Sequence, residues 1–432
     1  MNILKNRIVR GMLILTAASY ITRISGFFIR IFLISKIGAE GMGIYQLIFP
    51  VQIICYAISC SGIETAISKL TASEKSRGNY LYSGFIISFV LSLLLSALLI
   101  IYNKYICQNI LLEPRCSSLI YYLAAIVPLT SIHSCICSFF IGNKSTKITS
   151  VSLIIEQLTR IVAIILSILF LEYNSIFPGP ECAIFGSLCG EIAACAFCIF
   201  KLYRTGNYSF LTIKLSEIRR VIKLSVPVSL NRLMLSILQS IQNILIPSLL
   251  IVYGLSSKES LSIYGIILGL VIPFILFPGA LINSYSLLLL PEISSADSNG
   301  NIKKIRLLTK KSIWFCVIFG LICSLIFIIF GEYIGIYLLH NSLAGEYINK
   351  LGIICPFIYL NQTMSSIING LGKTSVTFGA GIFTVLLEIF IIIKLMPAIG
   401  IAGYIISFLI CNFINSLILL SYTTRKIFNQ HF

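Results

Sequence analysis

YLYSGFIISFVLSLLLSALLIIY, residues 80–102, is an apolar run without a single charged residue. A helix needs about 20 such residues to cross the hydrocarbon core of a bilayer. Similar runs recur along the 432-residue chain, in which 57% of the residues are hydrophobic and 11% are charged. The mean hydropathy is +0.98. A transmembrane β-barrel would alternate polar and apolar residues over about 10 positions instead. The sequence therefore predicts an all-α polytopic membrane protein.

The apolar runs and the polar breaks between them predict twelve membrane-spanning helices. These lie near residues 11–35, 43–67, 80–102, 118–141, 149–171, 182–203, 225–251, 261–290, 313–338, 348–370, 375–395 and 399–422. Pro273 and Pro278 fall within the eighth run, where they predict a kink.

The basic residues predict the orientation, because Lys and Arg concentrate in short cytoplasmic loops. With the amino terminus inside, only six of the 32 basic residues fall in outer segments: Lys36, Lys104, Arg115, Lys258, Lys350 and Lys394. Most of the others lie at the inner ends, so the formal charge of +17 needs no nucleic acid as a partner. Anionic lipid of the inner leaflet is the expected neighbour. Both termini are expected in the cytoplasm of a bacterial cell.

A proline-to-glycine pattern occurs twice, in the fourth and the tenth predicted helices. Each proline is followed by a glycine fourteen positions later and then by a lysine and two hydroxyl residues: Pro128, Gly142 and Lys144-Ser145-Thr146, then Pro356, Gly370 and Lys373-Thr374-Ser375. Arg23 and Arg232 likewise fall in the first and the seventh helices. This step of six predicts a duplication, with both halves in the same orientation. We expect six-helix bundles at 1–204 and 225–432, joined by a cytoplasmic linker at 205–224 that is either amphipathic and surface-lying or solvated.

Four arginines lie inside the apolar runs: Arg23, Arg30, Arg160 and Arg232. Each costs roughly 2.5–3.5 kcal/mol near the centre of a spanning helix, so such residues usually face a bundle interior or a water-filled cavity. Arg23 and Arg30 are two turns apart on one helix face, about 10 Å from each other. We expect Arg23, Arg30 and Arg232 to line a basic cavity that binds phosphate.

Four amides on the seventh helix would hydrogen-bond sugar hydroxyls in this cavity: Asn231, Gln239, Gln242 and Asn243. The alternative is that the arginines pair with buried acids or, for Arg30, extend to the interface. Arg160 is expected to form a structural pair with Glu156, four residues earlier on the same face. Glu156, Glu191 and Glu388 are candidate coupling or structural acids.

The fourteen cysteines do not predict a metal site or a cofactor. Cys195 and Cys198 form a CxxC, but it lies in an apolar helix without a second pair or a histidine cluster. We interpret them as packing residues. Cys107 and Cys116 flank an outer loop and are candidates for a disulfide.

One stretch carries a family resemblance: ITRISGFFIRIFLISKIGAEGMGIYQLIFP at 21–50, followed by SGIETAISKLTASEKSRGN at 61–79. It resembles the stage V sporulation protein B group, in the polysaccharide-transporter branch of the multidrug/oligosaccharidyl-lipid/polysaccharide (MOP) flippase superfamily. The resemblance implies a V-shaped, two-bundle, MATE-like transporter that works by alternating access. It implies an undecaprenyl-linked peptidoglycan or polysaccharide precursor as substrate, and cell-wall synthesis proteins as partners. Members often have fourteen helices, whereas twelve are predicted here.

Three other classes of function are alternatives. A multidrug–cation antiporter has the same fold, but a basic cavity would repel organic cations. An enzyme is not expected, because the only aspartate, Asp297, lies in a loop predicted to be cytoplasmic. A non-transporting scaffold for cell-wall synthesis would retain the same sequence pattern.

Overall fold

The computed structural model describes residues 7–73, 77–205 and 215–428. Within these ranges the regular structure is helical and contains no strand. Twelve helical segments there are long and apolar enough to cross a membrane. The prediction of an all-α polytopic membrane protein with twelve spans is therefore confirmed. The chain divides into two compact units, unit 1 at Met1–Ile244 and unit 2 at Leu245–Phe432.

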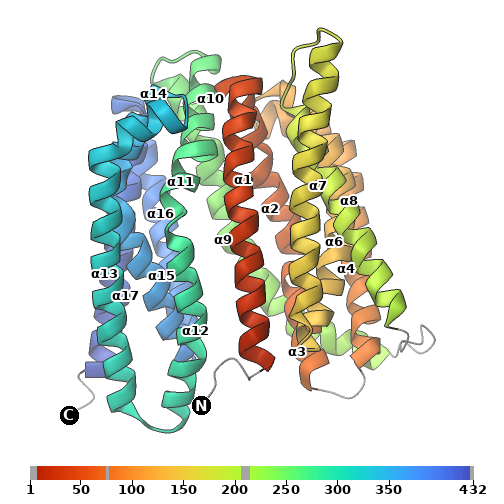
Figure 1. The fold of residues 1–432 in the computed structure, drawn as a ribbon, viewed down its shortest axis with the longest axis vertical. Helices are drawn as coiled ribbons and strands as arrows, with labels where there is room; N and C mark the ends of the chain where they lie inside the picture. Colours follow the sequence, from red (N-terminus) through yellow and green to blue (C-terminus); the bar gives the residue numbers. More distant parts are fainter. Residues whose placement is uncertain (1–6, 74–76, 206–214, 429–432) are drawn as a thin grey trace. The chain divides into compact units, whose positions relative to one another are not determined.

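Unit 1 contains the first six spans and most of the seventh (Figure 1). Its helices are α1 (Arg7–Gln46), α2 (Ile48–Ser59), α3 (Ser61–Ser73), α4 (Arg77–Ile101), α5 (Asn103–Tyr105), α6 (Ser117–Gly142), α7 (Thr146–Tyr173), α8 (Glu181–Arg204) and the first part of α9 (Leu215–Val252). A π-helical turn over Ile106–Ile110 and a 3-10 turn over Pro114–Cys116 connect α5 to α6.

Helix α6 is the centre of unit 1, because it packs against α3, α4 and α8. Its last residue, Gly142, lies directly against α3. A side chain at this position would place its Cβ only 2.7 Å from the Ser68 carbonyl oxygen. The glycine that ends the repeated sequence pattern therefore allows close approach of two helix backbones.

Unit 2 begins within α9 and contains the remaining spans. Its other helices are α10 (Ser257–Ile266), α11 (Ile272–Leu276), α12 (Gly279–Ser298), α13 (Ile302–Tyr333), α14 (Ser342–Leu351), α15 (Cys355–Gly370), α16 (Thr374–Ile399) and α17 (Ile401–Phe428). Further turns cover Ile267–Val271, Ile334–Leu338 and Gly352–Ile354.

Helix α15 holds the same place in unit 2 as α6 does in unit 1. It packs against α12, α13 and α17. A Cβ on its last residue, Gly370, would lie 2.9 Å from the Leu290 carbonyl oxygen of α12. The two copies of the proline-to-glycine pattern thus end at equivalent helix contacts.

Two predicted elements differ from those observed. The eighth run is interrupted by a π-helical turn at Ile267–Val271 and by the break between α11 and α12 at Phe277 and Pro278, so the expected kink is a division into shorter helices. Residues 206–214 of the predicted linker lie outside the described residues. From Leu215 onward the linker is the start of α9, and Val221 is fully buried in the core of unit 1 because it packs with α3 and α6 residues.

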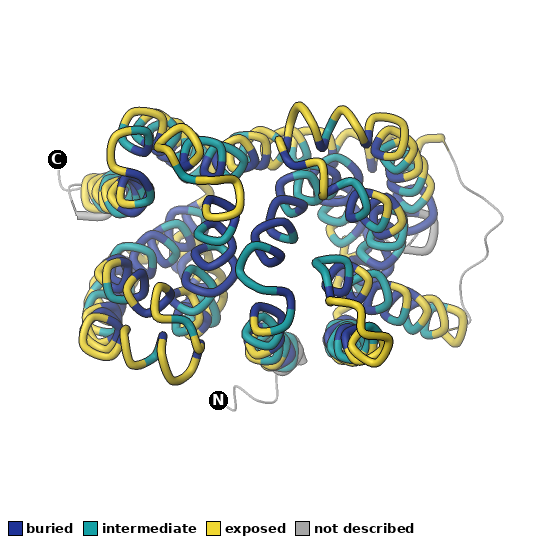
Figure 2. The backbone as a smooth tube through the Cα atoms, turned by 90° about the horizontal axis from the view of Figure 1, so that it is seen from above, coloured by how far each residue is buried: buried dark blue, intermediate teal, exposed yellow. Residues whose placement is uncertain are grey.

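Large apolar side chains cover much of the surface of the spans. Figure 2 shows helices with exposed residues along one edge and buried residues along another. On α7 the exposed edge includes Leu166, Leu169 and Phe170. Such an edge is stable in contact with lipid, where burial in protein gives no hydrophobic gain.

Ion pairs join the ends of spans where the sequence predicts the outer surface. Arg115 donates to Glu113 through Nε at 2.8 Å and to Glu40 of α1 through Nη1 at 2.7 Å. The hydrogen bonds that the Arg115 side chain and backbone N–H donate to Glu113 lower the pKa of Glu113 below its ordinary value. Lys36 of α1 similarly pairs with Glu172 of α7 at 2.8 Å.

Candidate functional site

Glu64 of α3 accepts hydrogen bonds from two other helices of unit 1. Arg232 of α9 donates from Nη1 to Oε1 at 2.9 Å. The Tyr56 hydroxyl of α2 donates to Oε2 at 2.6 Å. The guanidinium side chain remains 49% exposed despite this pairing. Arg232 is therefore a compensated charge with free donor groups, and pairing with an acid was the alternative left open for it by the sequence.

Glycine at position 62 lets α9 approach α3 closely enough for this ion pair. A Cβ on Gly62 would lie 2.3 Å from the Ser225 carbonyl oxygen and 2.2 Å from the Ser229 hydroxyl of α9. Further along α9, the Ser240 hydroxyl donates to the Pro50 carbonyl oxygen of α2 at 3.0 Å. Backbone contact on both sides of Arg232 thus sets its position.

Tyr56 also lines a pocket of about 270 Å³ between α2 and α6. The pocket wall is mostly apolar, with a few polar groups that could orient a ligand: Phe49, Gln52, Ile53, Tyr56, Ser59, Cys60, Ile126, Val127 and Thr130. This is the usual composition of a small-molecule binding site. The pocket and the Glu64–Arg232 pair share Tyr56, which connects an apolar cavity to a charged group.

A second charged group joins α1, α7 and α8. Arg160 donates to Glu156 one turn away on α7, which is the pair expected from their spacing. Helix α8 lies against this turn, since a Cβ on its Gly190 would come 2.6 Å from the Glu156 carbonyl oxygen. Arg30 of α1 is half-buried and lies within electrostatic reach of Arg160. The packing of α1 on α7 thus places two intramembrane arginines near each other despite their like charges.

The remaining predicted residues have different surroundings. Arg23 is exposed and makes no hydrogen bond or ion pair among the described residues. Asn231 and Gln239 are exposed, Asn243 is half-buried and Gln242 is buried. Glu388 is buried on α16 of unit 2. The expected substrate cavity with all of these residues stays a prediction.

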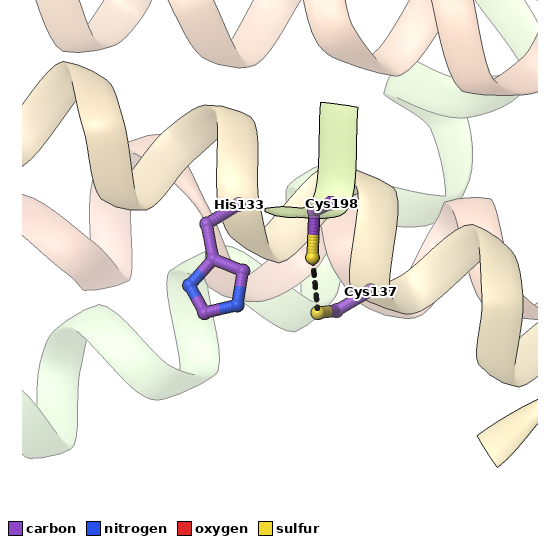
Figure 3. A group of neighbouring side chains, drawn as sticks. All are labelled: His133, Cys137 and Cys198. Atoms are coloured by element: carbon purple, nitrogen blue, oxygen red, sulfur yellow. Dashed lines mark hydrogen bonds between the residues drawn. The ribbon is translucent and has the colours of Figure 1, made fainter. Parts of the chain in front are cut away.

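His133 of α6, which is not among the predicted site residues, lies in a buried polar cluster. Its Nδ1 is 3.0 Å from Glu191 Oε1 of α8, and its Nε2 is 3.1 Å from the Ser152 hydroxyl of α7. Cys137 lies one turn along α6, with its Sγ 3.8 Å from that of Cys198 on α8. Figure 3 shows the side chains of His133, Cys137 and Cys198 gathered at one point. The spacing of His133 and Cys137 was the available sequence signal.

All fourteen cysteines are free thiols. Cys107 and Cys116, the disulfide candidates, are buried and each has a different neighbour. The Cys107 thiol donates to Asn103 Oδ1 at 3.3 Å, and Cys116 Sγ lies 3.9 Å from the Ile44 carbonyl oxygen. Burial raises the pKa of the Cys107 thiol to about 11. It therefore stays protonated and unreactive at neutral pH.

Solved structures that share the fold of this chain are transporters. The chain matches the inward-facing conformation of a multidrug resistance MATE family transporter of the MOP superfamily with a TM-score of 0.71, 15% identity, and coverage of 96% of this chain and 94% of that one. It matches a MOP superfamily transporter from Pyrococcus furiosus with a TM-score of 0.66, 15% identity, and coverage of 98% and 94%. The fold is therefore that of the MOP-superfamily transporters, as predicted.

The sequence comparisons identify the family. The model of the polysaccharide biosynthesis protein family matches residues 8–282, and the chain belongs to this family. Stage V sporulation protein B of Bacillus subtilis is 25% identical over 415 residues, which cover 92% of this chain and 80% of that protein. Sporulation protein YkvU of the same organism is 21% identical over 385 residues, 86% and 84% of the two chains. The predicted resemblance to stage V sporulation protein B is confirmed.

Proposed function

We propose that this protein is a flippase for a lipid-linked saccharide in the bacterial cytoplasmic membrane. Its substrate would be an undecaprenyl-linked precursor of peptidoglycan or another polysaccharide, moved from the inner to the outer leaflet. Membership of the polysaccharide biosynthesis family and the MOP-transporter fold support transport as the activity. The similarity to two sporulation proteins supports a role in the spore cortex or cell wall.

The observation that carries the substrate class is the state of Arg23. It lies within the first spanning helix, yet it is exposed and has no protein partner among the described residues. An intramembrane guanidinium without a carboxylate is stable when an anion or water reaches it. A pyrophosphate offers the matching bidentate acceptor. Arg232 has donor groups left beyond its bond to Glu64, and we propose that it contributes to the same headgroup site.

Transport by alternating access fits the duplicated sequence. The two proposed halves are residues 1–204 and 225–432, with the linker at 205–224 and both termini in the cytoplasm. Transporters built from parallel repeats bind substrate near the midplane and expose it to the two sides in turn.

A multidrug–cation antiporter is the second candidate, since solved structures of that class share the fold. The acids of unit 1 favour it less. Glu64 is paired with Arg232 and Glu156 with Arg160. A carboxylate already neutralised in this way attracts an organic cation weakly.

Reconstitution tests the proposal directly. Protein in liposomes would be supplied with a labelled undecaprenyl-pyrophosphate-linked saccharide, and headgroup transfer followed with a membrane-impermeant reagent. Arg23→Ala should slow transfer by about 10-fold or more, because a charged hydrogen bond contributes roughly 1.5–3 kcal/mol. Arg23→Lys should retain part of the rate, since lysine keeps the charge but lacks the bidentate fork. Lys104→Ala, at an exposed residue between α4 and α6, is the control and should leave the rate unchanged.

Three outcomes would contradict the proposal. Transfer that survives Arg23→Ala combined with Arg232→Ala and Glu64→Gln would exclude the headgroup site at these arginines. Efflux of an organic cation without lipid transfer would favour the antiporter. Folded protein that moves neither would favour the scaffold for cell-wall synthesis proteins.

A further inference from the structure

We propose that His133, Cys137 and Cys198 form a zinc site in the interior of unit 1. The site is independent of the transported substrate, because all three residues are buried within one unit. No metal was expected from the sequence, since the CxxC at Cys195 and Cys198 has no second pair. The three-dimensional cluster uses only Cys198 of that motif.

The distances match zinc coordination. In a tetrahedral site with Zn–S bonds of about 2.3 Å, two thiolate sulfurs lie about 3.8 Å apart. Cys137 Sγ and Cys198 Sγ are 3.8 Å apart. One ligand atom of His133 lies within 4.8 Å of both sulfurs. A tetrahedral site needs about 3.5 Å for such a nitrogen-to-sulfur separation, which a small rotation of the side chains provides.

The helices supply these ligands from rigid positions. His133 and Cys137 are four residues apart on α6, so they lie on one face of that helix. Cys198 comes from α8, which packs directly on α6. A metal held by these residues would connect the central helix of the unit to the last span before residues 205–224.

Glu191 gives the histidine the orientation found in zinc proteins. A carboxylate only accepts hydrogen bonds, so His133 Nδ1 carries the hydrogen directed at Glu191 Oε1, 3.0 Å away. Nε2 then has its lone pair free for a metal. Carboxylate–histidine–zinc arrangements of this kind hold the tautomer and raise the basicity of the ligand.

Ser152 lies beside two of the proposed ligand atoms. Its hydroxyl oxygen lies 3.1 Å from His133 Nε2 and 3.4 Å from Cys137 Sγ. The Ser152 hydroxyl donates to the Thr149 carbonyl oxygen at 3.0 Å, so its oxygen can accept a hydrogen bond. A water molecule would fill the fourth position and donate to this oxygen, giving a sulfur-rich set suited to zinc.

Charge balance also favours zinc in this apolar interior. Binding converts two thiols and Zn²⁺ into a neutral zinc dithiolate and releases two protons to water. No oxidant or electron transfer is needed. The neutral product is easier to bury than the free ion, because an uncompensated charge carries a large desolvation cost.

The test is metal content in the full-length protein, purified without a histidine tag, equilibrated with zinc and then desalted. Elemental mass spectrometry should find about one zinc per chain. Cys137→Ser and Cys198→Ser should each reduce the bound zinc at least 10-fold at limiting metal. Glu191→Gln should weaken zinc affinity by about 10–100-fold, the usual effect of losing such a supporting carboxylate.

Cys195→Ser is the matched control. Cys195 is also a buried thiol of α8, one turn from Cys198, but it is not part of the cluster. This variant should keep its zinc, and Co²⁺ added to it should give thiolate-to-metal charge-transfer absorption. Size-exclusion profiles check that each variant is folded.

Four results would overturn the site. The first is folded wild-type protein that is empty after equilibration with zinc. The second is a Cys137→Ser and Cys198→Ser double variant that retains the metal, and the third is a Cys195→Ser variant that loses it equally. The fourth is an intact mass lower by two hydrogens, which would identify a disulfide between Cys137 and Cys198 instead.

Discussion

Charged side chains inside unit 1 are held by partners that differ in sequence distance. Arg160 has its acid one helical turn away, whereas Arg232 reaches Glu64, 168 positions earlier in the chain. Arg23 has no protein partner among the described residues, which leaves it available to a ligand. The chemistry of each arginine thus depends on the helix opposite it.

Removing the carboxylate of Glu64 should destabilise the folded protein. Glu64→Gln leaves Arg232 without its counter-charge and Tyr56 without a charged acceptor. Because Arg232 is 49% exposed, the coupling energy in a double-mutant cycle with Arg232→Gln should be modest, about 1 kcal/mol. Thermal unfolding in detergent measures it. Additive effects of the two substitutions would show that the ion pair does not contribute.

Glu113 should make stability depend on pH. Its pKa is lowered by hydrogen bonds from Arg115 in the folded state. The resulting stabilisation is complete above the unfolded pKa of about 4.3 and is lost as pH falls through the lower folded pKa.

Comparison with Glu113→Gln isolates this effect, since other carboxylates titrate in both proteins. The wild type should be more stable at pH 7, by about 1 kcal/mol or less because the Arg115 side chain is 51% exposed. The difference should shrink towards zero on acidification. A difference that stays constant down to the folded pKa would rule out linkage through Glu113.

At the scale of helices, contacts of α6 and α15 organise their units. Both helices contain the proline-to-glycine pattern, and both end with a glycine against the backbone of a neighbouring helix. Gly62 and Gly190 make comparable approaches to α9 and α7. Small residues at such contacts stabilise membrane helices, because close packing replaces the hydrophobic effect as the source of association.

A methyl group at Gly142 should disturb the α3–α6 contact. Its Cβ would lie 2.7 Å from the Ser68 carbonyl oxygen and 2.8 Å from Thr71 Cβ, so a helix must shift. Gly142→Ala should lower the free energy of unfolding by about 1–3 kcal/mol.

Gly379→Ala is the control for this prediction, because no atom lies within 4 Å of the added Cβ on α16. Alanine is the better helix former, so this variant should be neutral or more stable by up to about 1 kcal/mol. Equal melting temperatures for Gly142→Ala and the wild type would contradict the close contact.

For the whole molecule, the predicted topology can be measured by cysteine labelling. None of the fourteen native cysteines is exposed, so the background should be low. In intact cells, an impermeant maleimide should label Lys104→Cys and Lys258→Cys, which are exposed and predicted to be outside. Lys303→Cys is exposed on the predicted inner side and should react only after permeabilisation. Labelling of Lys303→Cys in intact cells would contradict the predicted orientation.

The sequence alone was enough to identify the membrane class and the number of spans, because the length and charge of an apolar run decide whether it can cross a bilayer. It also determined the repeated pattern and the Glu156–Arg160 pair, since both depend on spacing along one helix. Three other features follow from tertiary packing alone. These are the partner of Arg232, the continuation of residues 215–224 into α9, and the approach of His133, Cys137 and Cys198. These contacts join residues on different helices, and their distances follow from how glycines and small side chains let the helices pack.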